Sequence, residues 1–230
     1  MLEIIGMDIK DCIIIEENGG DRIELIQSLS EGGLTPSYGL VKRIMKEINI
    51  PISVMIRPHS HTFKYNIYDI ETMKDDAKAF YDLGVKQIVI GILDENDMPN
   101  IKALDYILEG LDFDVTFHRA IDATKDYLKA VRQLNHNKHI THILTSGGPG
   151  RAVDNVENLK RAIKENPELT IIVSGRVNAS NIPELKEKLQ TDKNKNVDFH
   201  IGTGVREGLT FSPIYPEQLR NAVRIYKEGF

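Results

Sequence analysis

Cysteine is nearly absent from this chain of 230 residues, because Cys12 is the only one. No intrachain disulfide can form, which suits a reducing compartment, and we expect a cytoplasmic location. A chain of this length buries enough surface to fold without a disulfide or a structural metal. Cys12 lies at helical spacing with Ile9 and Ile13, so we expect it to be buried rather than reactive.

Long apolar runs and blocks of basic residues are missing as well. No run approaches the roughly 20 apolar residues that a membrane-spanning helix needs. Residues 1–20 contain no basic segment of the kind that begins a signal peptide. The formal net charge is −5, and lysine and arginine are not clustered. We therefore expect neither a membrane nor a nucleic acid as a partner.

One pattern is present and is repeated eight times along the chain. Short apolar runs rich in β-branched residues alternate with longer charged segments of helical spacing. In order, the runs are LEIIGM, RIELI, ISVMI, QIVIGIL, DVTFH, HILTS, TIIVSG and DFHIG. Between them, segments such as 69–84 place apolar residues on one helical face. Gly84 is expected to end that helix, and Asn181, which precedes Pro183, is expected to begin a later one.

This alternation predicts the fold class. Near-continuous apolar strands are typical of parallel sheets buried on both faces, and regular β–α alternation indicates an α/β protein. Eight strand–helix units in 230 residues fit a TIM (β/α)8 barrel that forms a single domain over residues 1–230. The alternative is a doubly wound open sheet, which often has a glycine fingerprint after its first strand. Here the first run continues into GMDIKDC, so we favour the barrel.

Four residues near strand ends are candidates for catalysis, because TIM-barrel active sites lie at the C-terminal ends of the strands. His118 and Arg119 end the fifth run, Arg57 ends the third, and Glu24 lies within the second. His118 would act as a general acid/base, with Glu24 orienting it or acting as the partner acid. Arg57 and Arg119 would hold a carboxylate or phosphate. The structural alternatives are a buried ion pair of Glu24 with one of these arginines and a core histidine at position 118.

Hydroxyl groups and glycines follow the last three runs and form a candidate anion-binding set. TIM barrels often hold phosphate in the loops after strands seven and eight. The set consists of Thr145, Ser146, Gly147, Ser174, Gly175, Arg176, His200, Gly202 and Gly204. Arg176 and Arg206 are expected to donate bidentate hydrogen bonds to the anion. The alternative is that the glycines only make tight turns and that His200 only lines the barrel.

Four motifs together resemble the CutC family, the so-called copper homeostasis proteins. They are DRIELIQSLSEGGLTPS (21–37), PISVMIRP (51–58), VTFHRAID (115–122) and ILTSGG (143–148), in the family's order. The resemblance runs from the first strand to about the eighth. It implies a TIM barrel, a cytoplasmic location, a homo-oligomer (a dimer) and a role in copper homeostasis with a copper ion as ligand.

The chain departs from the family where a copper ligand would be expected, since Cu(I) prefers thiolate and thioether sulfur. Many members have a cysteine directly after IEL of the second strand and another in the first strand, where this chain has Ile26 and Gly6. The family's RPRGG is RPHSH here. His59 and His61 in that loop make only half of a metal site, and we interpret them as solvated. No set of metal ligands is assigned from the spacing.

Two classes of function therefore remain open. The first is a CutC-type protein that takes part in copper homeostasis and binds copper without catalysis. The second is an enzyme that acts on a small phosphorylated or carboxylated metabolite at the C-terminal rim. A barrel that binds a metabolite without reacting is a weaker third. The residues that match the family are hard, charged or hydroxyl groups, which suit an anionic molecule better than copper: Glu24, Arg57, His118, Arg119, Thr145 and Ser146.

Overall fold

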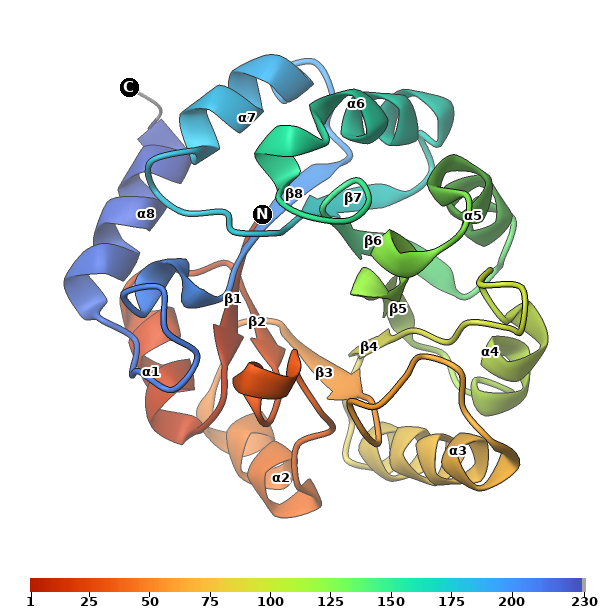
Figure 1. The fold of residues 1–230 in the computed structure, drawn as a ribbon. Helices are drawn as coiled ribbons and strands as arrows, with labels where there is room; N and C mark the ends of the chain where they lie inside the picture. Colours follow the sequence, from red (N-terminus) through yellow and green to blue (C-terminus); the bar gives the residue numbers. More distant parts are fainter. Residues whose placement is uncertain (229–230) are drawn as a thin grey trace.

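The computed structural model describes residues 1–228 and forms a closed barrel of parallel strands surrounded by helices (Figure 1). Each strand is hydrogen-bonded to the next in sequence, and β8 pairs with β1 to close the barrel. The predicted TIM (β/α)8 fold is therefore confirmed. The doubly wound alternative was wrong, because an open sheet would leave the first and last strands unpaired.

The strands occupy the eight apolar runs. They are β1 (Leu2–Gly6), β2 (Arg22–Leu25), β3 (Ile52–Ile56), β4 (Gln87–Ile90), β5 (Asp114–Phe117), β6 (Ile140–Thr145), β7 (Thr170–Val173) and β8 (Val197–Ile201). The helices are α1 (Ile9–Glu17), α2 (Tyr38–Glu47), α3 (Ile67–Asp82), α4 (Ile101–Ile107), α5 (Tyr127–Asn135), α6 (Val156–Glu165), α7 (Ile182–Leu189) and α8 (Pro216–Glu228). Short 3₁₀ helices follow several strands: η1 (Leu29–Glu31), η2 (Arg119–Ala123), η3 (Ala152–Asp154) and η4 (Thr203–Val205).

The expected helix boundaries have local causes. Gly84 has φ +87° just beyond α3, a conformation that costs glycine little. At the start of α3, Asn66 and Asp69 form a reciprocal capping box. Asn181 is the residue before α7, as its position ahead of Pro183 predicted. The stretch 190–196 is a loop.

Two separate apolar clusters follow from the alternation of side chains along each strand. Outward-facing residues such as Ile4, Val54 and Phe117 pack against the helices in one continuous core. Inside the barrel, the buried apolar cluster is small and consists of Ile5, Ile26, Met55 and Val89. Polar side chains fill much of the remaining interior. They include Glu3, Arg22, Ser53, Thr116 and His200, each of which is buried.

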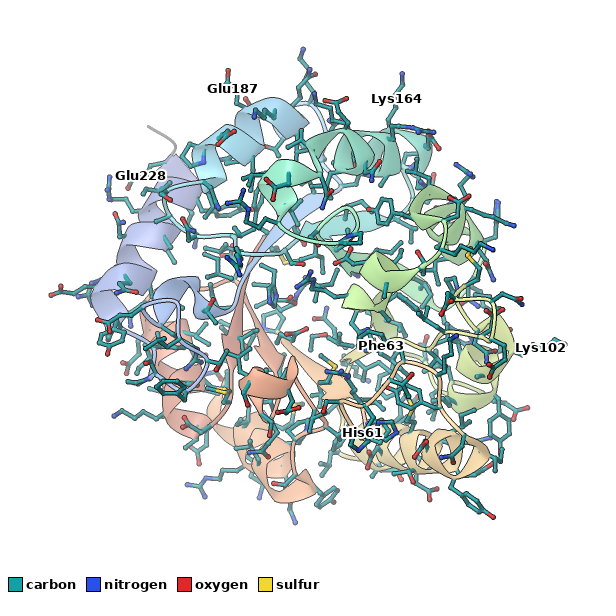
Figure 2. All side chains as sticks on the ribbon, viewed as in Figure 1. His61, Phe63, Lys102, Lys164, Glu187 and Glu228 are labelled. Carbon is teal, nitrogen blue, oxygen red and sulfur yellow. The ribbon has the colours of Figure 1, made fainter. Side chains whose placement is uncertain are left out.

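The outer surface of the helices carries the charged residues. Lys102 of α4, Lys164 of α6 and Glu187 of α7 point away from the barrel (Figure 2). None of the helices within residues 1–228 is long and apolar enough to cross a membrane. The outer surface is thus charged, whereas the interior of the barrel contains buried polar side chains.

Candidate functional site

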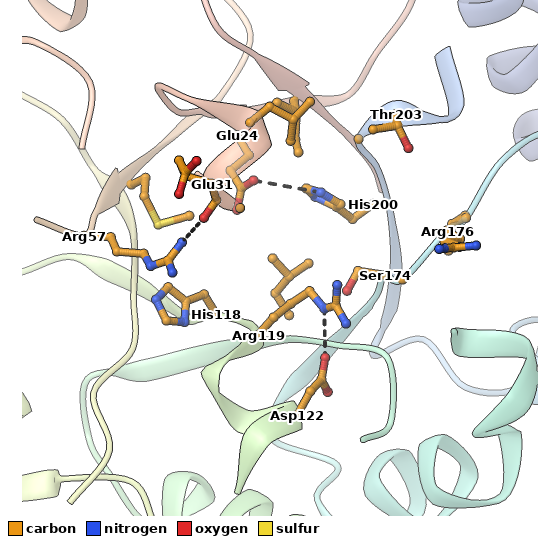
Figure 3. A pocket seen from close by; sticks show the side chains of 18 of the residues that line it. Glu24, Glu31, Arg57, His118, Arg119, Asp122, Ser174, Arg176, His200 and Thr203 are labelled. Atoms are coloured by element: carbon orange, nitrogen blue, oxygen red, sulfur yellow. Dashed lines mark hydrogen bonds and ion pairs between the residues drawn. The ribbon is translucent and has the colours of Figure 1, made fainter. Parts of the chain in front are cut away.

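The C-terminal ends of the strands surround a cavity of about 660 Å³ (Figure 3). This volume lies within the range of small-molecule sites in proteins. The charged and imidazole side chains that line it come from β2, β8 and the segments after β2, β3, β5 and β7: Glu24, Glu31, Arg57, His118, Arg119, Asp122, Arg176 and His200. Residues that are far apart in the sequence therefore meet at one rim.

The predicted site residues fall into two groups. All four candidate catalytic residues line the cavity, as do five of the anion-binding candidates: Ser174, Gly175, Arg176, His200 and Gly202. The other four, Thr145, Ser146, Gly147 and Gly204, are not among the described residues that line it. Gly147 and Gly204 instead permit close packing, because an added Cβ would lie 2.9 Å from Asn155 and 2.6 Å from the carbonyl of Val177, respectively.

Thr145 and Ser146 serve the carboxylate of Asp122. The Thr145 hydroxyl donates to Asp122 over 2.5 Å, and the Ser146 hydroxyl and backbone N–H donate over 2.8 and 3.1 Å. The N–H of Gly148 adds a further bond of 3.2 Å. Arg119 donates its Nε–H to the same carboxylate over 2.8 Å (Figure 3). Asp122 thus holds the loop after β6 in place and orients Arg119. The sequence did not reveal this role.

Glu24 faces His200 and neither of the two arginines considered as its partner in the structural alternative. Its Oε2 lies 3.9 Å from Nε2 of His200, and the dashed line between these residues in Figure 3 marks the contact. The structural alternative, an ion pair of Glu24 with Arg57 or Arg119, was therefore wrong. Arg57 donates from Nη1 to the backbone carbonyls of Glu31 and Gly33, at 2.8 and 2.9 Å. The reason is that the loop after β2 folds back over Arg57 and offers it neutral acceptors.

His200 is held from behind by Glu3. Nδ1 of His200 lies 2.7 Å from Oε1 of Glu3, and the other carboxylate oxygen of Glu3 accepts from Nε of Arg22 over 2.6 Å. Sequence reasoning missed Glu3, although its place among apolar residues in the first run was a signal. A carboxylate buried in a strand needs a partner, and here it has two.

This arrangement moves the pKa values of the three groups apart. Burial raises the pKa of Glu24 to about 7, against the opposing effect of His200. Burial also opposes ionisation of Glu3, but Arg22 and His200 outweigh it and lower the pKa of Glu3 to about 2. Burial alone would lower the pKa of His200, yet the two carboxylates raise it. The pKa of Glu24 thus lies near neutrality, beside a His200 whose pKa is raised and a Glu3 that stays ionised.

His118 has a different environment. Its Nδ1 accepts the backbone N–H of Ala120 over 3.1 Å, so the ring proton lies on Nε2. Nε2 is buried and has no hydrogen-bond partner among the residues that the structure describes. Burial and the charge of Arg57 lower the pKa of His118 to about 3. The ring is therefore neutral at physiological pH and carries an unpartnered N–H on a residue that lines the cavity.

Arg206 does not have the expected anion-binding role. It is fully buried and donates to the carboxylate of Asp11 over 2.7 Å and to the carbonyls of Ile5 and Ser212 over 3.0 and 2.8 Å. All three acceptors belong to the protein, so Arg206 ties the loop after β8 to the first strand. Arg176 is exposed at the rim and remains available to a ligand.

The histidines of the HSH loop do not assemble a metal site. Nε2 of His59 lies 3.3 Å from Asp69, and the rings of His59 and His61 stack loosely with centroids 5.0 Å apart. Within residues 1–228, the group of three potential ligands whose atoms lie within 4.8 Å of one another is Glu3, Glu24 and His200.

The fold and this rim define a TIM-barrel protein whose cavity combines cationic side chains with a buried carboxylate–histidine pair. The model of the CutC family matches residues 1–197. A CutC protein of Treponema denticola is 35% identical over 188 residues, which are 80% of this chain and 75% of the relative. One of Aliivibrio fischeri is 39% identical over 174 residues, 74% of this chain and 70% of the relative. The chain belongs to the CutC family, as its motifs predicted.

Solved structures agree with the fold. A crystal structure of a provisionally named copper homeostasis protein CutC from Streptococcus agalactiae has a TM-score of 0.77 and 27% identity, covering 88% of this chain and 98% of its own. Phosphoribosyl anthranilate isomerase from Thermococcus kodakaraensis has a TM-score of 0.67 at 15% identity, with 99% of each chain covered. The second likeness shows the barrel architecture alone.

Proposed function

We propose that the cavity is an active site for a small anionic metabolite, phosphorylated or carboxylated, and that Glu24 and His200 move a proton there. The observation that carries the proposal is the Glu24 carboxylate, which is 2% exposed and whose Oε1 has no partner within the described residues. Leaving a buried acceptor unpaired costs about 1–3 kcal/mol. A bound substrate would complete this hydrogen bond.

The cationic side chains supply the means to hold an anion. Arg57 is 6% exposed, its Nη1 is fixed by two carbonyls, and its Nε has no partner among residues 1–228. Arg119 is fixed by Asp122 and has 46% of its side chain exposed. Guanidinium groups held in this way present planar pairs of N–H donors that match carboxylate and phosphate oxygens.

The loops after β7 and β8 add neutral donors. The hydroxyl of Ser174 is buried, lines the cavity and has no partner in the described part of the chain. Gly175 follows it with φ +89°, and Gly202, which follows the neighbouring strand β8, also lines the cavity. These loops supply phosphate sites in many TIM barrels, which favours a phosphate or carboxylate at this side of the rim.

The arrangement of Glu3, His200 and Glu24 supports a proton transfer at the cavity. Glu3 stays ionised and holds Nδ1–H of His200, so Nε2 of His200 is directed toward Glu24. With one carboxyl whose pKa is near neutrality and one oriented imidazole, the pair supplies an acid and a base. In this proposal the acid–base pair is Glu24 with His200, while His118 has a separate role.

Copper is implied by the family name, and the residues present fit Cu(I) poorly. Cys12 is buried and does not line the cavity, and burial raises the pKa of its thiol to about 12. Met55 supplies the one sulfur atom among the described lining residues. The remaining donors are nitrogen and oxygen, which suit harder ions than Cu(I). We therefore assign no copper to this cavity. The cytoplasmic location and the homo-oligomer (dimer) expected from the sequence stay predictions.

Calorimetric titration tests the proposal with three probes: inorganic phosphate, pyruvate and 2-phosphoglycolate. We expect at least one probe to bind the wild type, and Arg57→Gln to weaken that binding at least tenfold through loss of a charge-assisted bond. Arg220→Gln is the matched control, since Arg220 lies on the outer helix α8 and contacts Asn18. Failure of all three probes to bind at millimolar concentration would contradict the proposal.

A parallel titration with Cu(I), under anaerobic conditions and with a competing chelator, tests whether the protein binds copper, as the family name implies. We expect any binding to be weaker than micromolar. Tighter binding that disappears in Glu24→Gln and His200→Gln would make copper the ligand of the cavity instead.

A further inference from the structure

We infer that the cavity enolises a carbonyl compound: Glu24 removes a proton from the carbon next to the carbonyl, while Nε2–H of His118 holds the carbonyl oxygen. This rests on the proposed function and names its substrate class, a small carbonyl compound that carries a phosphate or carboxylate. Three features of the molecule carry it, namely the tautomer of His118, the support of its ring, and the placement of Glu24 across the same cavity.

The tautomer of His118 makes it a donor. A general base needs a free lone pair on a ring nitrogen, and the lone pair of Nδ1 is used by the N–H of Ala120. Nε2 therefore carries the proton, is buried, and is without a partner among residues 1–228. A neutral imidazole with a fixed N–H is suited to an oxygen on which negative charge develops, because it donates without first neutralising the base.

The position of the ring is fixed by its neighbours. Gly91 follows β4 and leaves room for it, since a Cβ on Gly91 would lie only 2.3 Å from Nδ1 of His118. The ring of Phe63 packs on it with centroids 5.2 Å apart, and Arg57 lies over the same phenyl ring at 5.0 Å. A donor held this tightly needs little reorganisation when charge develops in front of it.

Glu24 and His118 face the same space from different sides. Glu24 belongs to β2 and His118 follows β5, and Figure 3 shows both side chains at the edge of the cavity with the interior between them. A substrate placed there would have its carbonyl oxygen near His118 and the adjacent C–H bond near Glu24. The arginines at the rim would take the anionic group.

The chemical step balances within the substrate and Glu24. The C–H bond breaks and its proton goes to the carboxylate of Glu24. The electron pair of that bond forms a carbon–carbon double bond, and the carbonyl π pair moves to the oxygen beside His118. Return of the proton to the same carbon regenerates the substrate, while exchange with solvent before return replaces the hydrogen. The step needs no further reactant.

Proton NMR in D₂O tests this step with dihydroxyacetone phosphate and pyruvate as probes. These probes separate the phosphate from the carboxylate as the recognised anion. We expect the signal of the C–H next to the carbonyl to disappear faster with the protein than in buffer for the probe that binds by calorimetry. Glu24→Gln should abolish this acceleration. A probe that binds without accelerated exchange would overturn the inference and leave anion binding intact, whereas absence of binding by every probe would overturn both.

Two variants of His118 separate a donor from a base. His118→Gln keeps an N–H group at a reach similar to Nε2, and His118→Phe keeps the ring volume without a donor. Loss of one such donor typically lowers catalysis about 100- to 1,000-fold, so we expect that fall in His118→Phe and substantial retention in His118→Gln. Equal loss in both variants would overturn the assigned role.

The ring itself can be observed without any substitution. Nitrogen-15 NMR of the wild type should show Nδ1 of His118 unprotonated and Nε2 protonated from pH 5 to 8, with no titration in that range. A ring that becomes protonated between pH 6 and 8 would overturn the inference even if the variants fail to fold.

Discussion

Nδ1 of His200 and Oε1 of Glu3 lie 2.7 Å apart although the two residues are 197 positions apart in the sequence. Glu3 is in the first strand and His200 in the last, and the two residues are register partners across the seam that closes the barrel. The bond that orients the proposed acid–base pair is thus made only when the barrel closes. Folding and the organisation of the site are coupled at this seam.

The buried ion pair of Glu3 with Arg22 should contribute strongly to the free energy of unfolding. Glu3→Gln leaves Arg22, which is 1% exposed, without its main counter-charge. Breaking a buried pair in this way costs about 3–5 kcal/mol, and urea unfolding at pH 7 measures it. The double variant Glu3→Gln, Arg22→Met is the control and should recover most of the loss. A single variant as stable as the wild type would show that Asp198, 3.7 Å from Arg22, suffices as a partner.

Stability should fall as the pH rises from about 6.5 to 8, because at lower pH the lowered pKa of His118 has the opposite effect and offsets that of Glu24. The pKa of Glu24, about 7 in the folded protein, lies above its ordinary value, so the folded state binds this proton more tightly than the unfolded chain. Its contribution is complete below the unfolded pKa and is lost as the pH passes through 7. The raised pKa of His200 acts in the same direction. Glu3, whose pKa is lowered to about 2, loses its contribution only in acid.

Urea unfolding at pH 5, 6, 7 and 8 measures how the free energy of unfolding changes with pH. In Glu24→Gln the fall at higher pH should be smaller. Glu31→Gln is the matched control, because Glu31 is an exposed acid beside the same cavity. Equal slopes in the wild type and Glu24→Gln would contradict the pKa assigned to Glu24.

The loop after β6 should depend on Asp122. Asp122→Asn weakens a set of bonds from Thr145, Ser146 and Gly148, and we expect a loss of about 3 kcal/mol in the free energy of unfolding. Asp154→Asn removes an exposed ion pair with Arg151 and should change stability little. Thermal denaturation of both variants gives the comparison. Similar melting temperatures for the two would show that the loop is held by its packing instead.

Much of the architecture could be predicted from the sequence because its causes are local. Each strand is a short apolar run, each helix has periodic apolar residues, and Gly84 and Asn181 mark helix ends. The candidate residues at the rim also follow from topology, since parallel strands place their C-terminal ends together. Glu24, Arg57, His118 and Arg119 were located in this way.

The partners of those residues could not be predicted, because pairing depends on barrel register and loop paths. Glu24 meets His200 through the closure of β8 on β1, and Arg57 is capped by a loop that folds back after β2. Asp122 had no predicted role, yet it holds Thr145 and Ser146 by hydrogen bonds, and neither of them lines the cavity. The tautomer of His118 depends on one backbone N–H, which no spacing reveals.

One methyl group added at Gly91 should displace the ring of His118. In Gly91→Ala the new Cβ would lie 2.3 Å from Nδ1 of His118, so the ring must move and the bond to Ala120 is lost. We expect a stability loss of about 1–3 kcal/mol and at least a tenfold fall in carbonyl C–H exchange. Gly39→Ala is the control, since nothing lies within 4 Å of a Cβ there. Unchanged exchange in Gly91→Ala would contradict the fixed donor.

A crystal structure of the protein with 2-phosphoglycolate, whose planar carboxylate resembles an enolate, tests the central claim most directly. We predict that the ligand lies in the cavity with an oxygen within hydrogen-bond distance of Nε2 of His118 and its anionic groups on Arg57 or Arg119. Glu24 should lie against the ligand carbon that corresponds to the reacting position. A ligand bound elsewhere, or a cavity without ligand at saturating concentration, would contradict the account.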